Sequence, residues 1–368
     1  HNYLPLVARN RVGQTVPTLS PTATASQTPE RTSTATVTAT PPSGTSTHTA
    51  TPTLTPTGTI TSMSTATPTG TTTPTPTSTS AEDRGLIVFH SDLNRNNVNY
   101  DLYILDVATE NMTPLTQRPA DVDRHPAWSP DGERIAFTSD SIGGQDDIFF
   151  IRSDGTNRER VTITLADESD PTWAPDSQRV AFISDQVGGQ NDLFILDLTT
   201  NQAQRLLNIP LNDEYEPHWS PVADEIVFRS NYQGNQFDLY SVNVQTKAIT
   251  RLTNTLDEER EPRWSPDGSQ VAYARFNRVQ DQYDLYVLDI ATGESQQLTF
   301  SNLWDEQEPA WSPDGRYLVY RADAISNQYD LYRLDLETLE AHRLTNTLTA
   351  DEFAPDWYAS PQASLRRR

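Results

Sequence analysis

The feature of this sequence that most constrains its fold is a repeat of about 46 residues, each unit marked by a tryptophan. Six tryptophans recur at steps of 45, 46, 45, 47 and 46 residues. They are Trp128, Trp173, Trp219, Trp264, Trp311 and Trp357. Each stands in a segment such as "PAWSPDG", whereas the seventh tryptophan, Trp304, falls outside the pattern. Spacing this regular predicts an array of equivalent structural units.

Each complete repeat contains four short segments suited to β-strands. After the Trp segment come an apolar run such as "RIAFTSD", a second run that opens with Asp, such as "DLFILDL", and a last short run such as "AITRLTN". Turn-forming Asp-Gly, Gly-Gly and Asn-rich stretches separate them, and no window shows helical periodicity over three turns. Four strands every 46 residues predict an all-β propeller with one four-stranded sheet per blade.

The two ends of the repeat region complement each other. The sixth Trp segment, "FAPDWYASPQ" at residues 353–362, has no strands after it, and residues 86–116 supply three strands with no Trp segment before them. We therefore expect the C-terminal inner strand to pair with the three N-terminal strands, which closes a ring of six blades and removes its open edges. Val222 and Ala223 replace Asp-Gly in the third Trp segment, so we expect a different turn there.

The pattern "PxWSPDGxxIAFxSD…DLYxLD…RLT" resembles the repeat of TolB-like propellers, which are relatives of the WD-repeat propellers. Pro126–Gly132, Pro262–Gly268 and Pro309–Gly315 match every position of the Trp motif. The resemblance covers residues 86–361 and implies a six-bladed propeller. This architecture hosts many activities, so the resemblance implies a fold and leaves the function open.

The first eighty residues have a different composition. From Thr15 to Ser80, 28 of 66 residues are Thr, with ten Pro and nine Ser. Such a segment buries too little apolar surface to fold, and it is typical of an O-glycosylated stalk or of a bare flexible linker. Candidate acceptors include Thr53, Thr57, Thr73 and Thr75. We predict four regions: an N-terminal segment (1–14), a stalk (15–84), the propeller (85–361) and a basic tail (362–368).

Charge narrows the classes of partner. The chain has 27 basic and 50 acidic residues; residues 1–80 hold three and one of these, so the remainder has 24 and 49, a net charge of −25. This acidity argues against a nucleic-acid partner and favours cations or basic partners. No apolar run is long enough to span a bilayer, and the chain lacks cysteine. With the stalk and a first residue that is typical of processing, His1, this predicts an extracellular or surface protein of a bacterium.

Two sets of residues are candidate sites. Five residues before each repeat tryptophan stands an acid, and three before it stands an acid in four of the six repeats. Together these ten are Asp123, Glu168, Glu214, Glu259, Glu306, Glu352, Asp170, Glu216, Glu261 and Glu308. We expect them around the mouth of the central channel, either as a ring that holds a hard cation such as Ca²⁺ or as solvated and turn-bonding acids. The second set is an apolar N-terminal cluster, Tyr3, Leu4, Pro5, Leu6 and Val7, which we expect to be either a docking segment or a remnant beside a removed signal or anchor.

These features favour a non-enzymatic structural or interaction protein. GxSxG, HExxH, CxxC and EF-hand motifs are absent from the sequence. We predict a propeller on a stalk whose N-terminal segment docks head-to-tail on other copies and builds a fibre or surface array. The alternatives are a TolB-like propeller that binds an envelope protein and a polysaccharide-active propeller enzyme.

Overall fold

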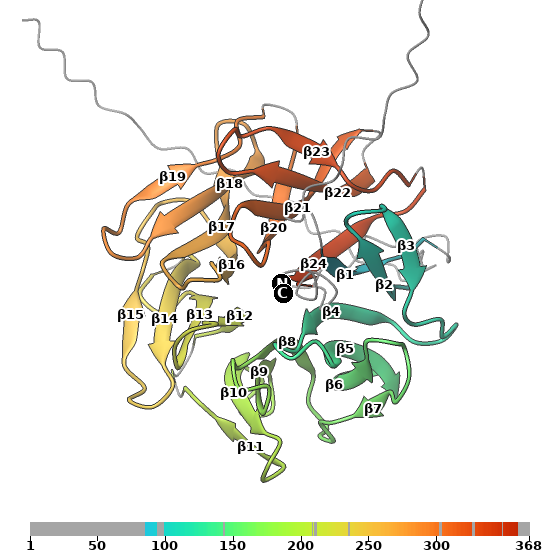
Figure 1. Cartoon of the computed structure of the whole chain (residues 1–368). Coiled ribbons are helices and arrows are strands. Elements are labelled where there is room, and N and C mark those ends of the chain that lie inside the picture. The colour runs from blue at the N-terminus through green and yellow to red at the C-terminus, as the bar shows by residue number, and fades with distance from the viewer. Residues whose placement is uncertain are drawn as a thin grey trace, which may run out of the picture. The chain divides into compact units, whose positions relative to one another are not determined.

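The computed structural model describes residues 85–359, apart from residues 94–98, 143, 208, 210–211, 235, 302–303, 326–327 and 348. The predicted docking segment, stalk and basic tail lie outside the described residues. Within the described part, all regular structure is β-strand or turn, and six antiparallel four-stranded sheets surround a common axis (Figure 1). The predicted all-β, six-bladed propeller is therefore confirmed.

We number the blades from the one that contains the first strand. Blade 1 holds β24 (Glu352–Tyr358), β1 (Leu86–Ser91), β2 (Asp101–Asp106) and β3 (Asn111–Pro114). Blade 2 holds β4 (Asp123–Trp128), β5 (Arg134–Ile142), β6 (Gln145–Arg152) and β7 (Glu159–Arg160). Blade 3 holds β8 (Glu168–Trp173), β9 (Arg179–Ser184), β10 (Asp192–Asp197) and β11 (Gln202–Arg205).

The remaining blades repeat this order. Blade 4 holds β12 (Glu214–Trp219), β13 (Glu225–Ser230), β14 (Asp238–Asn243) and β15 (Ile249–Arg251). Blade 5 holds β16 (Glu259–Trp264), β17 (Gln270–Asn277), β18 (Gln282–Asp289) and β19 (Ser295–Gln297). Blade 6 holds β20 (Glu306–Trp311), β21 (Tyr317–Ile325), β22 (Gln328–Asp335) and β23 (Ala341–Arg343). The first strand in each list lies nearest the axis (Figure 1).

Blade 1 closes the ring as predicted. Strand β24 pairs antiparallel with β1, so that Leu86 lies opposite Tyr358 and Ile87 opposite Trp357. Gly132 in blade 2 packs against this closing strand: a Cβ atom at Gly132 would lie 2.2 Å from the ring of Tyr358, and its φ is +71°. Only glycine fits a left-handed position with so little space beside it.

The repeat tryptophans form the interfaces between blades. Each interface is a separate apolar cluster that contains one repeat tryptophan packed against the central strands of the preceding blade. For example, Trp219 packs with Leu193 and Ile195 of blade 3. Because every sheet is covered on both faces, its strands are apolar on both faces, which explains runs such as "DLYILD".

The turn after each inner strand follows the sequence motif. In blade 2 the Ser129 hydroxyl donates to Asp131 Oδ1 (2.6 Å), and the Gly132 N–H donates to the Ser129 carbonyl (2.8 Å). The third Trp segment differs, as expected, because none of Pro221, Val222 and Ala223 has a positive φ. Its Val222 side chain instead fills the space beside Gly268 of blade 5, where an added Cβ would lie 2.3 Å away.

Candidate functional site: the channel belt and the apolar rim

The inner strand of every blade is an edge strand. It pairs with one neighbour in its own sheet, and its other edge faces the inner strands of adjacent blades around the axis. Each of these strands contains a β-bulge at the residue three before its tryptophan, followed by a proline that has no N–H to pair. The bulged residues have φ between +47° and +57°. We call these six residues the channel belt: His125, Asp170, Glu216, Glu261, Glu308 and Ala354.

Carboxylates of the channel belt satisfy the edge N–H groups of the next blade. The Glu261 N–H donates to Glu216 Oε2 (2.6 Å), the Glu308 N–H to Glu261 Oε2 (2.6 Å) and the Ala354 N–H to Glu308 Oε2 (2.7 Å). An edge N–H left unpaired in this partly buried position would be costly. These acids therefore link blades 4, 5, 6 and 1 to one another.

Cations balance most of the belt. Arg229 Nε lies 3.0 Å from Glu216 Oε2, Arg321 Nε lies 3.0 Å from Glu308 Oε2, and His125 Nδ1 lies 2.8 Å from Asp170 Oδ1. Burial alone would raise the pKa of Asp170, but the His125 charge and hydrogen bond hold that pKa below its ordinary value.

Glu261 lies between Glu216 and Glu308 in the channel belt. Burial, followed by the charges of Glu308 and Glu216, raises the pKa of Glu261 well above its ordinary value. Its side chain therefore holds a proton more readily than an exposed glutamate does.

A second row of hydrogen bonds also joins neighbouring blades. Its acceptor side chains stand two residues after the channel belt, and its donors are the N–H groups of the repeat tryptophans. The Trp128 N–H donates to Asp356 Oδ2 (2.6 Å), and the Trp219 N–H donates to Thr172 Oγ1 (3.1 Å). The Trp264 N–H has His218 Nδ1 as its acceptor (3.1 Å), so that nitrogen is the unprotonated one. We call the channel edge that these two rows of bonds hold together the collar.

The acids five residues before each tryptophan lie elsewhere. They open the inner strands and are at most 3 % exposed: Asp123, Glu168, Glu214, Glu259, Glu306 and Glu352. The partners of Glu352 lie in the segment that enters its strand, and the partner of Asp123 lies in its own blade. Glu352 accepts from Thr347 (2.7 Å) and Thr345 (3.0 Å), and Asp123 accepts from Arg158 (2.9 Å).

Burial shifts the titration of most of these acids. It raises the pKa of Glu168, and it raises the pKa of Glu259 and Glu306 to about 7. Burial, followed by the neighbouring charge of Asp192, raises the pKa of Glu214 to about 8, and burial raises the pKa of Glu352 to about 8 as well. The carboxyl groups of Glu214, Glu259, Glu306 and Glu352 are therefore largely protonated in mildly acidic solution.

The ten acids predicted as one ring thus fall into two sets with separate partners. The channel belt holds four of them along the channel edge, and the other six are buried at the strand starts. Within residues 85–359, outside the gaps given above, no group of three or more His, Cys, Asp or Glu side chains is arranged to hold a metal ion. The Ca²⁺ site remains a prediction, and the bonds of Glu216, Glu261 and Glu308 are those of the alternative, acids that accept backbone N–H groups.

The belt loses its sixfold regularity where the ring closes. Ala354 replaces the acid in blade 1, and an aromatic cluster lies beside it. The His90 ring stacks on Phe353 (5.3 Å between centroids) and meets His125 edge-on (5.5 Å), while the Arg321 guanidinium lies 4.7 Å from the centre of the Phe353 ring. Burial, followed by the charge of His125, lowers the pKa of His90, so this ring stays neutral. The sequence did not predict this cluster, because its members stand in different repeats.

Exposed apolar side chains gather on one face of the propeller. In antiparallel blades, the turn between the second and third strands and the connection into the next inner strand share one face. Eight of the ten exposed large apolar side chains among the described residues lie in these segments. We call them the apolar rim: Ile163, Leu165, Val187, Tyr232, Leu256, Val279, Phe300 and Trp304. Val222 and Leu339 lie in turns of the opposite face.

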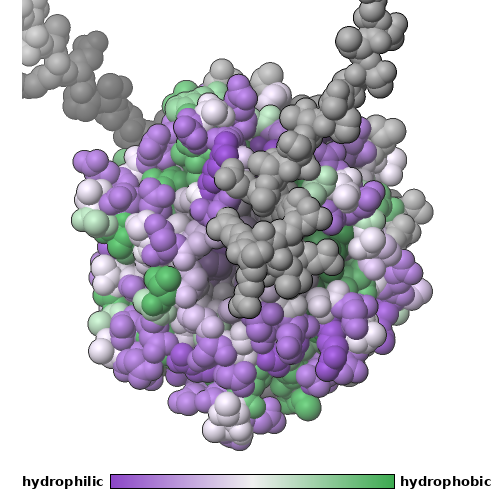
Figure 2. All heavy atoms as spheres, viewed as in Figure 1, coloured by the Kyte–Doolittle hydropathy of each residue, from purple (hydrophilic) through white to green (hydrophobic). Residues whose placement is uncertain are grey.

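Most of the coloured surface in Figure 2 is hydrophilic, and hydrophobic residues are exposed only in places. In the rim, Leu165 is 90 % exposed, Leu256 78 % and Val279 95 %. Scattered apolar residues are ordinary on a protein surface, but their concentration on one face makes this face the candidate binding surface.

These features place the protein in the class of closed six-bladed propellers. Hydrogen bonds between blades form its collar, and most of its exposed large apolar side chains lie on one face. The family described as TolB beta propeller domain matches residues 166–277. No curated protein matches the sequence. The part of the chain that the structure describes contains no helix long and apolar enough to cross a membrane.

Solved structures support the same assignment. TolB from Acinetobacter baumannii has 23 % identity and a TM-score of 0.65, over 75 % of this chain and 67 % of that one. A putative TolB from Agrobacterium tumefaciens has 16 % identity and a TM-score of 0.57, over 75 % and 99 %. Hydrazine synthase from Kuenenia stuttgartiensis has 12 % identity and a TM-score of 0.62, over 76 % and 48 %. The chain therefore contains a TolB-like β-propeller, a fold that also occurs in an enzyme.

Proposed function

We propose that this protein is a non-enzymatic interaction protein of the bacterial cell surface, in which the propeller carries the binding face and an O-glycosylated stalk extends from it. The N-terminal segment, Tyr3 to Val7, docks on other copies and builds a fibre or surface array. The observation that carries this proposal is the apolar rim, which exposes eight large apolar side chains on one face.

The collar supports a scaffold role. Its edge N–H groups are bonded to acids, hydroxyls and imidazoles of adjacent blades, so the collar side chains hold the blades in register. A rigid scaffold lowers the entropic cost of binding at the loops it carries. The rim loops are therefore well placed to bind another protein.

The test compares the full chain with a variant that lacks residues 1–10. We expect the purified full chain to form oligomers or fibres in sedimentation velocity and in electron micrographs, and we expect the deletion to remain monomeric. The matched control deletes ten residues from the middle of the Thr/Pro-rich stretch, residues 51–60, and should assemble like the full chain. Unchanged assembly after removal of residues 1–10 would refute the proposal.

A second candidate is a TolB-like propeller that binds another protein of the cell envelope, which the match to TolB structures favours. Capture experiments from the native envelope distinguish the two. A distinct partner retained by the propeller, with no self-association, would support this second function over the first.

A further inference from the structure

We infer that one part of the apolar rim receives the N-terminal segment of a second copy of this chain. This part, the docking patch, consists of Tyr232, Leu256, Val279, Phe300 and Trp304. The inference rests on the proposed self-association and identifies the surface that it uses.

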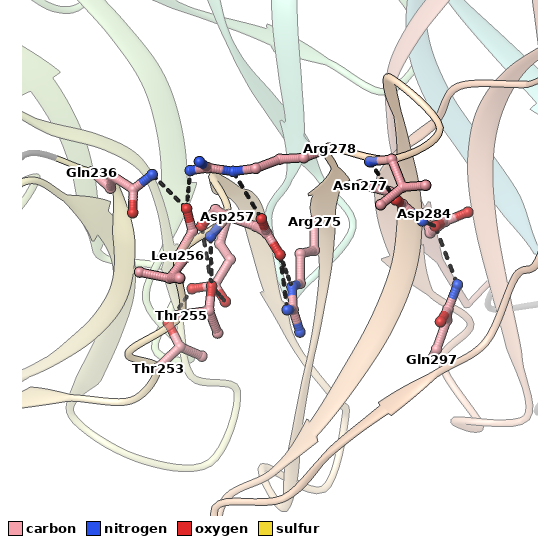
Figure 3. Close-up of polar contacts among 12 residues, drawn as sticks. Gln236, Thr253, Thr255, Leu256, Asp257, Arg275, Asn277, Arg278, Asp284 and Gln297 are labelled. Carbon is pink, nitrogen blue, oxygen red and sulfur yellow. Dashed lines mark hydrogen bonds and ion pairs between the residues drawn. The ribbon is translucent and has the colours of Figure 1, made fainter. Parts of the chain in front are cut away.

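Hydrogen bonds join the loops of the docking patch to one another. Gln236, in the loop that follows Tyr232, and Arg278, next to Val279, both donate to the Leu256 carbonyl from opposite sides (Figure 3). On the next boundary, Gln282 Nε2 donates to the carbonyl of Ser301 (2.5 Å), and the Ser301 hydroxyl donates to the Trp304 carbonyl (3.0 Å). The loops that carry the patch are therefore bonded to one another from blade 4 to the connection that enters blade 6.

The Leu256 loop is held rigidly while its side chain faces water. Asp257 pairs with Arg275 (2.9 Å) and with Arg278 (3.0 Å), and the Asp257 N–H donates to the Thr255 hydroxyl (3.2 Å) (Figure 3). An exposed leucine on a fixed loop contributes little to folding, because it buries little apolar surface. It can bind a partner with little further loss of conformational entropy.

Leucine recurs at this position. Leu165 and Leu256 stand three residues before the buried acid of the following inner strand, and both are largely exposed. Leu211 and Leu303 have the same offset and lie outside the described residues. A leucine repeated at a water-facing position is better explained by binding than by folding.

The N-terminal segment has the chemistry that suits this patch. Tyr3, Leu4, Leu6 and Val7 supply apolar groups, and the first acid of the chain is Glu30. Arg9 and Arg11 follow the apolar residues, whereas residues 81–368 carry a net charge of −25, from 24 basic and 49 acidic residues. Asp281, exposed two residues after Val279, offers a nearby negative charge. Apolar contact and charge therefore both favour this occupant.

The topology makes the contact between copies head-to-tail. Leu86, just after Gly85, pairs with Tyr358 at the end of β24, so the chain enters the propeller on the face where inner strands end. The docking patch lies on the face where inner strands begin. A contact between two different faces is heterologous and propagates into a filament unless it closes a ring. Residues 12–84 reach about 230 Å when extended at roughly 3.1 Å per residue, so their length permits the contact.

The experiment uses the full chain and three variants. Leu256→Asn and Val279→Asn, combined in one variant, remove two exposed apolar groups of the docking patch. Leu339→Asn is the matched control, because Leu339 is an exposed leucine on the opposite face at φ +58°, a backbone conformation that asparagine tolerates. The third variant lacks residues 1–10. Sedimentation velocity measures self-association, fluorescence anisotropy measures binding of a labelled peptide of residues 1–14, and thermal unfolding checks the fold.

We expect the double variant to weaken self-association and peptide binding at least about tenfold with an unchanged melting temperature, since each side chain loses apolar burial in the contact. Leu339→Asn should behave like the wild type. If removal of residues 1–10 abolishes assembly while the double variant assembles normally, the docking patch is wrong and the proposed function stands. If neither change affects assembly, both are wrong. A monomeric full chain that binds the peptide only after residues 1–10 are removed would show docking within one chain and overturn the head-to-tail contact.

Discussion

The buried acids at the strand starts predict an unusual dependence of stability on pH, and Glu214 is the best place to measure it. Its side chain is fully buried, and burial together with the charge of Asp192 raises its pKa to about 8. In the unfolded chain it titrates near its ordinary value of about 4.5. Between these two values the folded state holds a proton that the unfolded state has released, so the free energy of unfolding falls as the pH rises.

The size of the effect follows from the two pKa values. Raising the pH from 5 to 8 should remove about 3 kcal/mol of stability through this one group. Glu168, Glu259, Glu306 and Glu352 also have raised pKa values and act in the same direction. We therefore expect these acids to favour pH 5 over pH 8, whereas His90 and His218, whose pKa values burial lowers, act in the opposite direction.

Substitution by Gln isolates the contribution of Glu214, because the amide has nearly the same shape and does not ionise. Urea unfolding of the wild type and of Glu214→Gln at pH 5 and pH 8 gives four free energies. The loss of stability between the two pH values should be smaller in the variant by about 3 kcal/mol. Glu294→Gln, an exposed acid in the turn after β18, is the matched control and should lose as much as the wild type. An equal loss in Glu214→Gln and wild type would refute the argument.

Three further predictions concern the ring and its acids. Truncation before Phe353 removes the inner strand of blade 1, so the propeller should unfold cooperatively in circular dichroism; a truncated protein with full thermal stability would contradict closure by β24. Gly132→Ala should cost roughly 3 kcal/mol, because it adds a clash with Tyr358 to left-handed strain. Gly188→Ala (φ +79°, open space) should cost about 1 kcal/mol, and equal costs would refute the contact. Finally, a cation ring predicts heat and a raised melting temperature on titration with Ca²⁺, and neither would occur if these acids only bond the backbone.

The contacts of individual residues show how far the sequence could predict the site. The repeat placed an acid before every tryptophan, but it could not separate the buried Glu214 from the channel-edge Glu216, two residues away. Alternation along a strand would put both on one side. The bulge at Glu216, with φ +53°, breaks that alternation and turns the two side chains towards different partners.

The sequence by itself determined the number of blades, the four strands in each and the closure by the last Trp segment, because these depend on spacing and local turn chemistry that repeat along the chain. Only the tertiary structure decided which acids are buried, which satisfy edge N–H groups of the next blade, and which apolar side chains remain in water. Those properties depend on contacts between blades about 46 residues apart, which no single repeat contains. Leu256 and Leu193 are both leucines in the sequence, and the packing of neighbouring blades alone leaves one 78 % exposed and the other fully buried.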